Sequence, residues 1–189
     1  MANNLTIEDI NNLYFWATKL EESITYGEIE SKEDILNLTY IEARNSLPKE
    51  VFKLNRLECL NIWVEDLTEL PKEIGNLNNL KKLEIECPNL NELPKEIGNL
   101  NNLEDLTIEC PNLNELPKEI GNLNNLEKLE IKCSNLKELP KEIWNLSEFE
   151  VEFDIKNNNN KELLKYIVDS PNNENKDVEL KINIKRKEA

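Results

Sequence analysis

Apolar residues recur along the middle of the chain with a spacing that changes inside each segment. In the segment that begins at Leu80, Leu83 and Ile85 alternate with polar residues, which predicts a short strand with one buried face. Further along, the apolar residues Leu93 and Ile97 lie four positions apart, and this spacing predicts a helical or 3₁₀ return. The pattern therefore describes a unit of strand, turn and return.

This unit recurs every 23 residues. Leu-Pro-Lys-Glu blocks begin at Leu70, Leu93, Leu116 and Leu139, and a variant unit opens at Leu47. One unit cannot cover its own apolar side, so we expect neighbours to stack with parallel strands about 4.8 Å apart. Stacking produces a broad, regular surface instead of a pocket, which favours binding over catalysis.

The order of residues within the unit resembles that of the leucine-rich repeat family. The unit reads Leu80-x-x-Leu83-x-Ile85, then Cys-Pro-Asn-Leu, then Leu-Pro-x-x-Ile-Gly-x-Leu. The resemblance covers about Leu36 to Phe153, and Leu-Pro-Lys-Glu-Ile-Gly-Asn-Leu is similar to the 23-residue repeats of bacterial members. It implies an α/β fold: a right-handed solenoid with a concave parallel β-sheet, a helical N-terminal cap and an α/β C-terminal cap. It also implies a non-catalytic protein that binds another protein.

Both ends of the chain depart from the repeat and are predicted to cap the stack. Residues 1–33 are interpreted as a helical N-terminal cap, because Ile7, Ile10 and Leu13 recur at helical spacing and Thr6 can cap their helix. A partner-binding helix is the alternative. The solenoid, of about five repeats, is expected over residues 34–156, and the C-terminal cap over residues 157–189. Beyond the last full repeat we expect a strand from Phe149 to Ile155, a loop from Asn157 to Asn160, a helix from Glu162 to Val168 and a strand from Val178 to Ile184.

The four cysteines follow the repeat instead of a metal-binding motif. Cys87, Cys110 and Cys133 are spaced by the repeat itself, and the chain contains no histidine. Each of these three lies two residues after the last strand apolar residue, one fewer than in the family pattern, so we expect a shorter turn with the thiols inward and inert. Without the shorter turn they would face outward. Cys59 is expected on the concave side, as the thiol most open to a labelling reagent.

Comparison of the repeats with one another shows where the chain varies. The units that start at Leu70 and Leu93 differ at only three positions, all predicted to point to solvent from the strand: Lys81/Glu104, Lys82/Asp105 and Glu84/Thr107. Residues expected on the convex side, such as Asn101 and Asn102, recur unchanged. This contrast favours a concave face diversified for recognition. Recent duplication with a few chance changes, or an engineered consensus sequence, would also produce it.

The candidate partner-binding residues are therefore the variable or exposed strand positions. They are Asn61, Trp63, Lys82, Glu84, Glu86, Asp105, Thr107, Glu109, Lys128, Glu130 and Lys132. Trp63 is a large ring at a position expected to be exposed, and aromatic residues of this kind often anchor interfaces. Packing against the N-terminal cap is the alternative for Trp63. Opposite charges at Lys82, Asp105 and Lys128 would also stabilise the sheet itself.

The net charge of -15 limits the class of partner. Such acidity repels nucleic acid and anionic lipid, so we expect a protein or peptide partner with a neutral or basic contact surface, no nucleic acid and no membrane insertion. The charge is equally well explained by solubility alone. No catalytic residue, metal site or cofactor is predicted, because carboxylate pairs such as Glu104 and Asp105 are expected by chance in so acidic a chain.

The N-terminal residues lack both a basic segment and an apolar run, and no other stretch reaches membrane-spanning length. The expectation is a soluble, cytoplasmic protein, with export by a route that needs no cleaved signal left open. The lead hypothesis is a protein–protein interaction module. The alternative hypothesis, a secreted bacterial effector or surface adhesin that binds a host protein, predicts the same fold.

Overall fold

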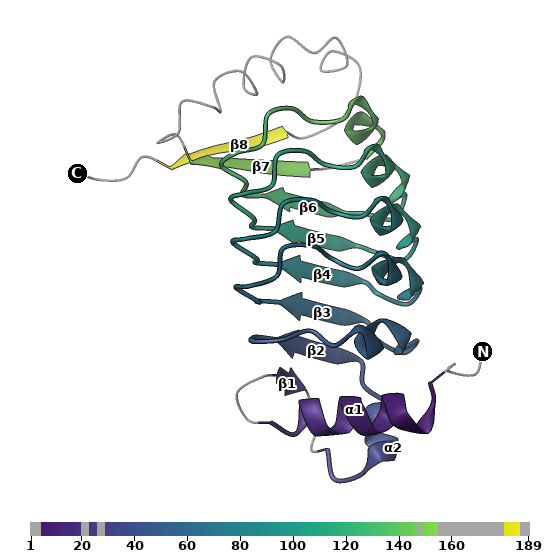
Figure 1. The fold of residues 1–189 in the computed structure, drawn as a ribbon. Coiled ribbons are helices and arrows are strands. Elements are labelled where there is room, and N and C mark those ends of the chain that lie inside the picture. Colours follow the sequence, from purple (N-terminus) through teal and green to yellow (C-terminus); the bar gives the residue numbers. More distant parts are fainter. Residues whose placement is uncertain (1–4, 20–22, 26–28, 147–148, 155–179, 186–189) are drawn as a thin grey trace.

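A computed structural model describes residues 5–19, 23–25, 29–146, 149–154 and 180–185. Their strands form one eight-stranded sheet in the order β1 to β8, so each strand lies beside its neighbours in the sequence. Figure 1 shows the strands stacked one above another, with α1 at the N-terminal end and β7 and β8 at the other end. This arrangement is the solenoid that the repeat pattern predicts.

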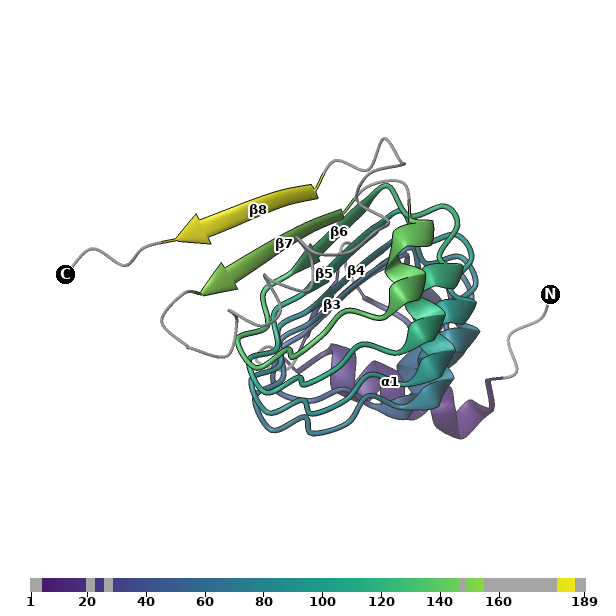
Figure 2. The ribbon, with the colours of Figure 1, turned by 90° about the horizontal axis from the view of Figure 1, so that it is seen from above.

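Each repeat contributes one short strand and one 3₁₀ helix. The strands are β2 (Tyr40–Ala43), β3 (Cys59–Ile62), β4 (Lys82–Ile85), β5 (Asp105–Ile108) and β6 (Lys128–Ile131). The 3₁₀ helices are η1 (Lys49–Lys53), η2 (Lys72–Asn76), η3 (Lys95–Asn99), η4 (Lys118–Asn122) and η5 (Lys141–Asn145). Figure 2, seen along the stack, shows the strands on one side and the helical turns on the opposite side.

The core lies between the strands and the helical returns. The second residue of each strand points inward, and Leu60, Leu83 and Leu106 pair in parallel register with no exposed surface. Burying a leucine side chain stabilises the fold by about 1.5–3 kcal/mol relative to leaving it exposed. The alternate residues point away from the core. These outward residues of β2 to β6 lie on the side of the sheet that was predicted to be concave, which is called the strand face below.

The corner before each 3₁₀ helix is set by proline and glycine. Pro71 precedes η2 with φ −62° and ψ 143°, a φ that the pyrrolidine ring fixes in advance. A Cβ atom added to Gly98 would lie within 3.0 Å of the Glu119 carbonyl oxygen, so only glycine allows the next return to pack this closely. Trp144 takes the place of this glycine in η5, where it is 3% exposed.

The repeat thiols point inward, as predicted. Cys87, Cys110 and Cys133 are buried. Each Sγ contacts a carbonyl oxygen of the preceding repeat at 3.6–3.7 Å, and the acceptors are those of Ile62, Ile85 and Ile108. Because one thiol occupies the same place in each turn, the shorter turn is a regular element of the stack.

The N-terminal cap is more elaborate than predicted. The expected helix is α1 (Ile7–Ala17), and Thr6 forms a capping box with Asp9. Lys53 of η1 donates to both carboxylate oxygens of Asp9, at 2.9 and 2.8 Å, and so ties the helix to the first repeat. The sequence did not predict the short helix α2 (Lys32–Ile35) or the strand β1 (Ser23–Thr25), which pairs antiparallel with β2.

Both strands predicted beyond the last full repeat are present. They are β7 (Phe149–Asp154) and β8 (Leu180–Lys185), which continue the sheet in parallel. Their register sets Glu150 opposite Lys181 and Asp154 opposite Lys185. The loop predicted over 157–160 and the helix predicted over 162–168 lie outside the described residues.

Candidate binding face

The strand face consists of three rows of side chains that cross the strands. The first row holds Tyr40, Cys59, Lys82, Asp105 and Lys128. The middle row holds Glu42, Asn61, Glu84, Thr107 and Glu130. The third row, just beyond the strands, holds Arg44, Trp63, Glu86, Glu109 and Lys132, aligned by main-chain hydrogen bonds. All eleven candidate residues fall in these rows, so the structure brings them onto one surface.

At the N-terminal end of this face, the side chains bind one another. Arg44 Nε donates to Glu42 Oε1 at 2.7 Å, and the Tyr40 hydroxyl donates to Glu42 Oε2 at 3.0 Å. Asn61 Nδ2 lies 3.4 Å from the Tyr40 hydroxyl, and Asn61 is only 8% exposed. Asn61 was predicted as an open contact residue, but its side chain is nearly covered and is part of this network.

Trp63 differs from its predicted setting. Its ring is partly buried, and the Arg44 guanidinium carbon lies 5.4 Å from the ring centroid, within the range of a cation–π contact. The indole Nε1 is buried and has no hydrogen-bond partner among the described residues. The ring was predicted to be exposed, but it is partly buried and has a contact partner within the sheet. The partner is a strand-face arginine of the neighbouring repeat.

At the C-terminal end, Lys132 joins two carboxylates. Its Nζ lies 2.8 Å from Glu130 and 3.5 Å from Glu109, and Lys128 Nζ lies 3.0 Å from Glu130. The hydrogen bond from Lys132, followed by that from Lys128, lowers the pKa of the Glu130 carboxyl against the effect of burial. Glu130 is therefore a firmly ionised residue held between two cations.

The centre of the face lacks this compensation. Burial, a hydrogen bond with Glu84 and the negative charges of Glu109 and Glu84 raise the pKa of Glu86, and Lys132 only partly opposes them. Among the ion pairs within the described residues, none joins Lys82 to Glu84. Glu84 on β4 and Glu86 just beyond it thus form two neighbouring carboxyl groups in partly buried positions, without a dedicated cation.

Cys59 is the most accessible of the four thiols. It is partly exposed in the first row, whereas the other three are buried. Burial nevertheless raises its pKa, with smaller contributions from neighbouring charges. The expectation that this thiol is the most open to a reagent agrees with its position, and its raised pKa predicts slow labelling.

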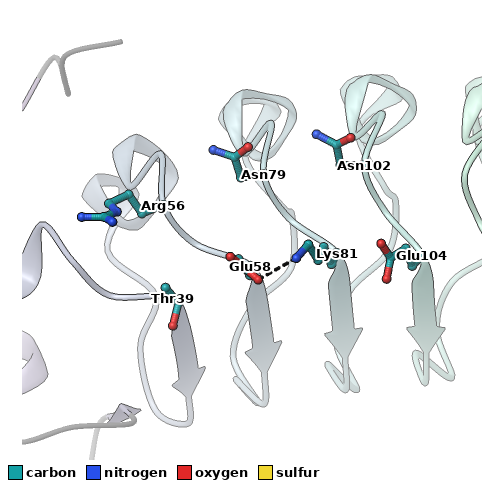
Figure 3. Close-up of a pocket in the computed structure, with 7 residues that line it drawn as sticks. All are labelled: Thr39, Arg56, Glu58, Asn79, Lys81, Asn102 and Glu104. Atoms are coloured by element: carbon teal, nitrogen blue, oxygen red, sulfur yellow. Dashed lines mark hydrogen bonds and ion pairs between the residues drawn. The ribbon is translucent and has the colours of Figure 1, made fainter.

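A polar hollow lies beside the strand face, at the N-terminal ends of the strands. This strand-start groove has a volume of about 450 Å³ and is lined by Thr39, Arg56, Glu58, Asn79, Lys81, Asn102 and Glu104. Figure 3 shows the lining side chains along the stack, with the Lys81–Glu58 ion pair of 2.9 Å between adjacent repeats. Hydrogen bonding to Glu58 raises the pKa of Lys81. Asn79 and Asn102 were assigned to no site from the sequence, because their role depends on contacts between repeats.

The described residues include no group of three or more His, Cys, Asp or Glu side chains placed to hold a metal ion. Within this part of the chain, every helix is too short or too polar to cross a bilayer.

Comparison with known proteins agrees with the repeat architecture. The family model for the leucine-rich repeat region matches residues 28–112. Among solved structures, the chain is similar to an internalin (inlF) from Listeria monocytogenes, with 14% sequence identity and a TM-score of 0.30. That similarity covers 95% of this chain and 63% of the internalin chain. A search of curated proteins found no match. The matched region and its stacked strand and 3₁₀ units thus identify residues 28–112 as a leucine-rich repeat region.

Proposed function

We propose that the chain is a non-catalytic module that binds a protein or peptide partner on its strand face. The observation that carries the proposal is the continuity of this face. Five parallel strands in one register place charged, polar and aromatic side chains in three rows, outside a core that the repeat keeps constant. Such a surface can contact an extended partner at many points, whereas catalysis needs groups that converge on one reacting atom.

The proposal also concerns the chemistry of the partner. The strand face carries an excess of carboxylates over cations in its central part, where Glu84, Glu86 and Glu109 lie close together. A partner with a neutral or basic contact surface would avoid like-charge repulsion here. The whole chain has a net charge of -15, which would speed the approach of a basic partner at low ionic strength.

Charge reversal on the strand face tests this proposal. Peptides that bind the protein are selected from a random displayed library, and their affinities are measured for the variant Glu84→Lys, Asp105→Lys, Lys128→Glu. We expect the affinity to fall by about tenfold or more. A control with the same change in net charge is Glu73→Lys, Glu115→Lys, Lys95→Glu, whose exposed side chains lie outside the three rows. Equal affinities of the two variants would contradict the strand face as the binding surface.

A further inference from the structure

At both ends of the strand face, a middle-row glutamate forms an ion pair with the third-row residue of the same repeat. The centre of the face lacks such a pair among the described residues. On β2, the middle-row Glu42 pairs with the third-row Arg44 at 2.7 Å. On β6, the equivalent Glu130 and Lys132 pair at 2.8 Å. Residues two apart on a strand point to the same side, so each of these strands neutralises its own carboxylate.

Strand β4 has a carboxyl group at both of these positions. Its middle-row residue is Glu84 and its third-row residue is Glu86, so the cation of the other strands is replaced by a second acid. The cation whose charge lowers the pKa of Glu86 is Lys132, which is already shared between Glu109 and Glu130. The raised pKa of Glu86 reports the same imbalance, because the folded protein disfavours its charged form.

An aromatic ring lies next to this pair. Trp63 precedes Glu86 in the third row, since the main-chain N–H of Glu86 donates to the carbonyl of Ile62, beside Trp63. On its other flank, Trp63 already holds the guanidinium of Arg44, which is also bound to Glu42. The protein thus contains one complete example of a cation that contacts both this ring and a middle-row carboxylate.

We infer that the partner of the strand face supplies the missing cation, as an arginine or lysine side chain that binds Glu84 and Glu86 beside the ring of Trp63. This inference rests on the proposed function and specifies the central contact. Two carboxylates fit the planar fork of a guanidinium, and an aromatic neighbour adds a cation–π contact. Because this position lies midway along the rows, it would also be shielded by the surrounding contacts, as binding hot spots are.

A double-mutant cycle tests the inference with peptides selected from the random library. Each arginine or lysine of a selected peptide is replaced by glutamine, and the affinities are measured for the wild type and for Glu84→Gln, Glu86→Gln. We expect one replacement to weaken binding by about tenfold to the wild type but by less than about twofold to the variant. The matched control, Glu104→Gln, Glu127→Gln, removes two exposed carboxylates at the strand starts and should retain the tenfold loss.

Two results would overturn the inference. One is an equal loss for every peptide cation in the wild type and the variant, which places the cation elsewhere. The other is a set of selected peptides that bind the strand face without any arginine or lysine. Thermal melting shows that each variant is folded, and the single variants Glu84→Gln and Glu86→Gln repeat the cycle with a smaller change.

The cycle separates this inference from the proposed function. If reversal of the strand-face charges abolishes binding but the cycle is additive, only the cation contact is wrong. If reversal leaves binding unchanged, or if the library yields no binder, the proposed function itself is contradicted.

Discussion

The side-chain amide of Asn102 donates a hydrogen bond of 2.6 Å to the main-chain carbonyl oxygen of Asn78, one repeat earlier. The same link joins Asn125 to Asn101 at 2.6 Å. These bonds form a ladder between neighbouring repeats, on the segment that leads from each 3₁₀ helix to the next strand. Asn102 and Asn125 therefore have a structural role in the stack.

We expect Asn102→Ala to destabilise the protein by about 1 kcal/mol, the usual net contribution of one hydrogen bond. Chemical denaturation monitored by circular dichroism measures the change. Asn101→Ala is the control, because this neighbouring side chain is exposed and only its main-chain carbonyl takes part in the ladder. Equal effects of the two substitutions would show that the side-chain hydrogen bond contributes nothing.

The ladder also explains why some residues outside the strands are constant from repeat to repeat. Constant residues outside the strands, contrasted with variable residues on them, favoured a strand face diversified for recognition. Asn102 and Gly98 now have structural reasons for their constancy. The contrast between constant and variable positions is therefore weak support for recognition. The geometry of the three rows is the stronger support.

Gly98→Ala should destabilise the protein by about 1–3 kcal/mol, as overpacking does. The new methyl group would collide with the carbonyl of Glu119 in the next return. Denaturation of this variant is compared with that of Lys95→Ala, an exposed position in the same 3₁₀ helix. A neutral or stabilising effect of Gly98→Ala would mean that the returns can separate without loss.

The buried thiols predict a loss of stability in alkali. Burial raises the pKa of Cys110 and of Cys133 from 9.0 to about 12. Between these values the unfolded thiol ionises while the folded thiol keeps its proton. Stability is therefore fully present below pH 9 and falls above it, by about 1.4 kcal/mol per pH unit for each such thiol. Denaturation midpoints from pH 8 to 11 measure this slope.

The variant Cys110→Val, Cys133→Val should flatten the alkaline slope, because valine does not titrate. It occupies the equivalent place at Val64, which is 5% exposed. A slope unchanged by the double substitution would show that other groups, such as lysines or tyrosines, cause the alkaline loss.

The raised pKa of Glu86 predicts a change of stability between acidic and neutral pH, whereas the thiols act in alkali. Its pKa is raised on folding above its ordinary value of 4.5, so its contribution to stability is present below that value and is lost as the pH rises through the folded pKa. Glu86→Gln should therefore stabilise the protein at pH 7 by roughly 0.5 kcal/mol and leave it almost unchanged at pH 4. Urea denaturation at both pH values measures the difference.

Glu58→Gln is the matched control for this prediction. Glu58 is paired with Lys81 at 2.9 Å, so its removal should not stabilise the protein at pH 7. If Glu86→Gln were destabilising at neutral pH, the crowding of carboxyl groups on β4 would be contradicted.

How much the sequence could predict depended on the regularity of each segment. The strands, the 3₁₀ returns, the inward thiols and the rows of the strand face could be predicted in the full repeats. Several copies of the unit show the same type of residue at each position there. The first repeat was harder: Tyr40 pairs with Cys59, only 19 residues along, instead of 23. The roles of Glu42 and Arg44 on the strand face were therefore missed.

Contacts that depend on how far a side chain extends could not be predicted from the sequence either. Trp63 was placed correctly on the strand face, but its cover by Arg44 follows from the register of the irregular repeat. Asn61 was likewise placed correctly, yet it is nearly buried by its hydrogen-bonded neighbours. The strand-start groove arises from residues of several repeats and has no motif of its own.

Recognition on the strand face can be located residue by residue by nuclear magnetic resonance of the isotopically labelled protein, titrated with a library-selected peptide. We predict that the largest changes in chemical shift fall on outward residues of β3 to β6 and on the indole of Trp63, which Trp63→Phe identifies. Largest changes confined to the 3₁₀ helices or the strand-start groove, with the strand face unaffected, would contradict the account.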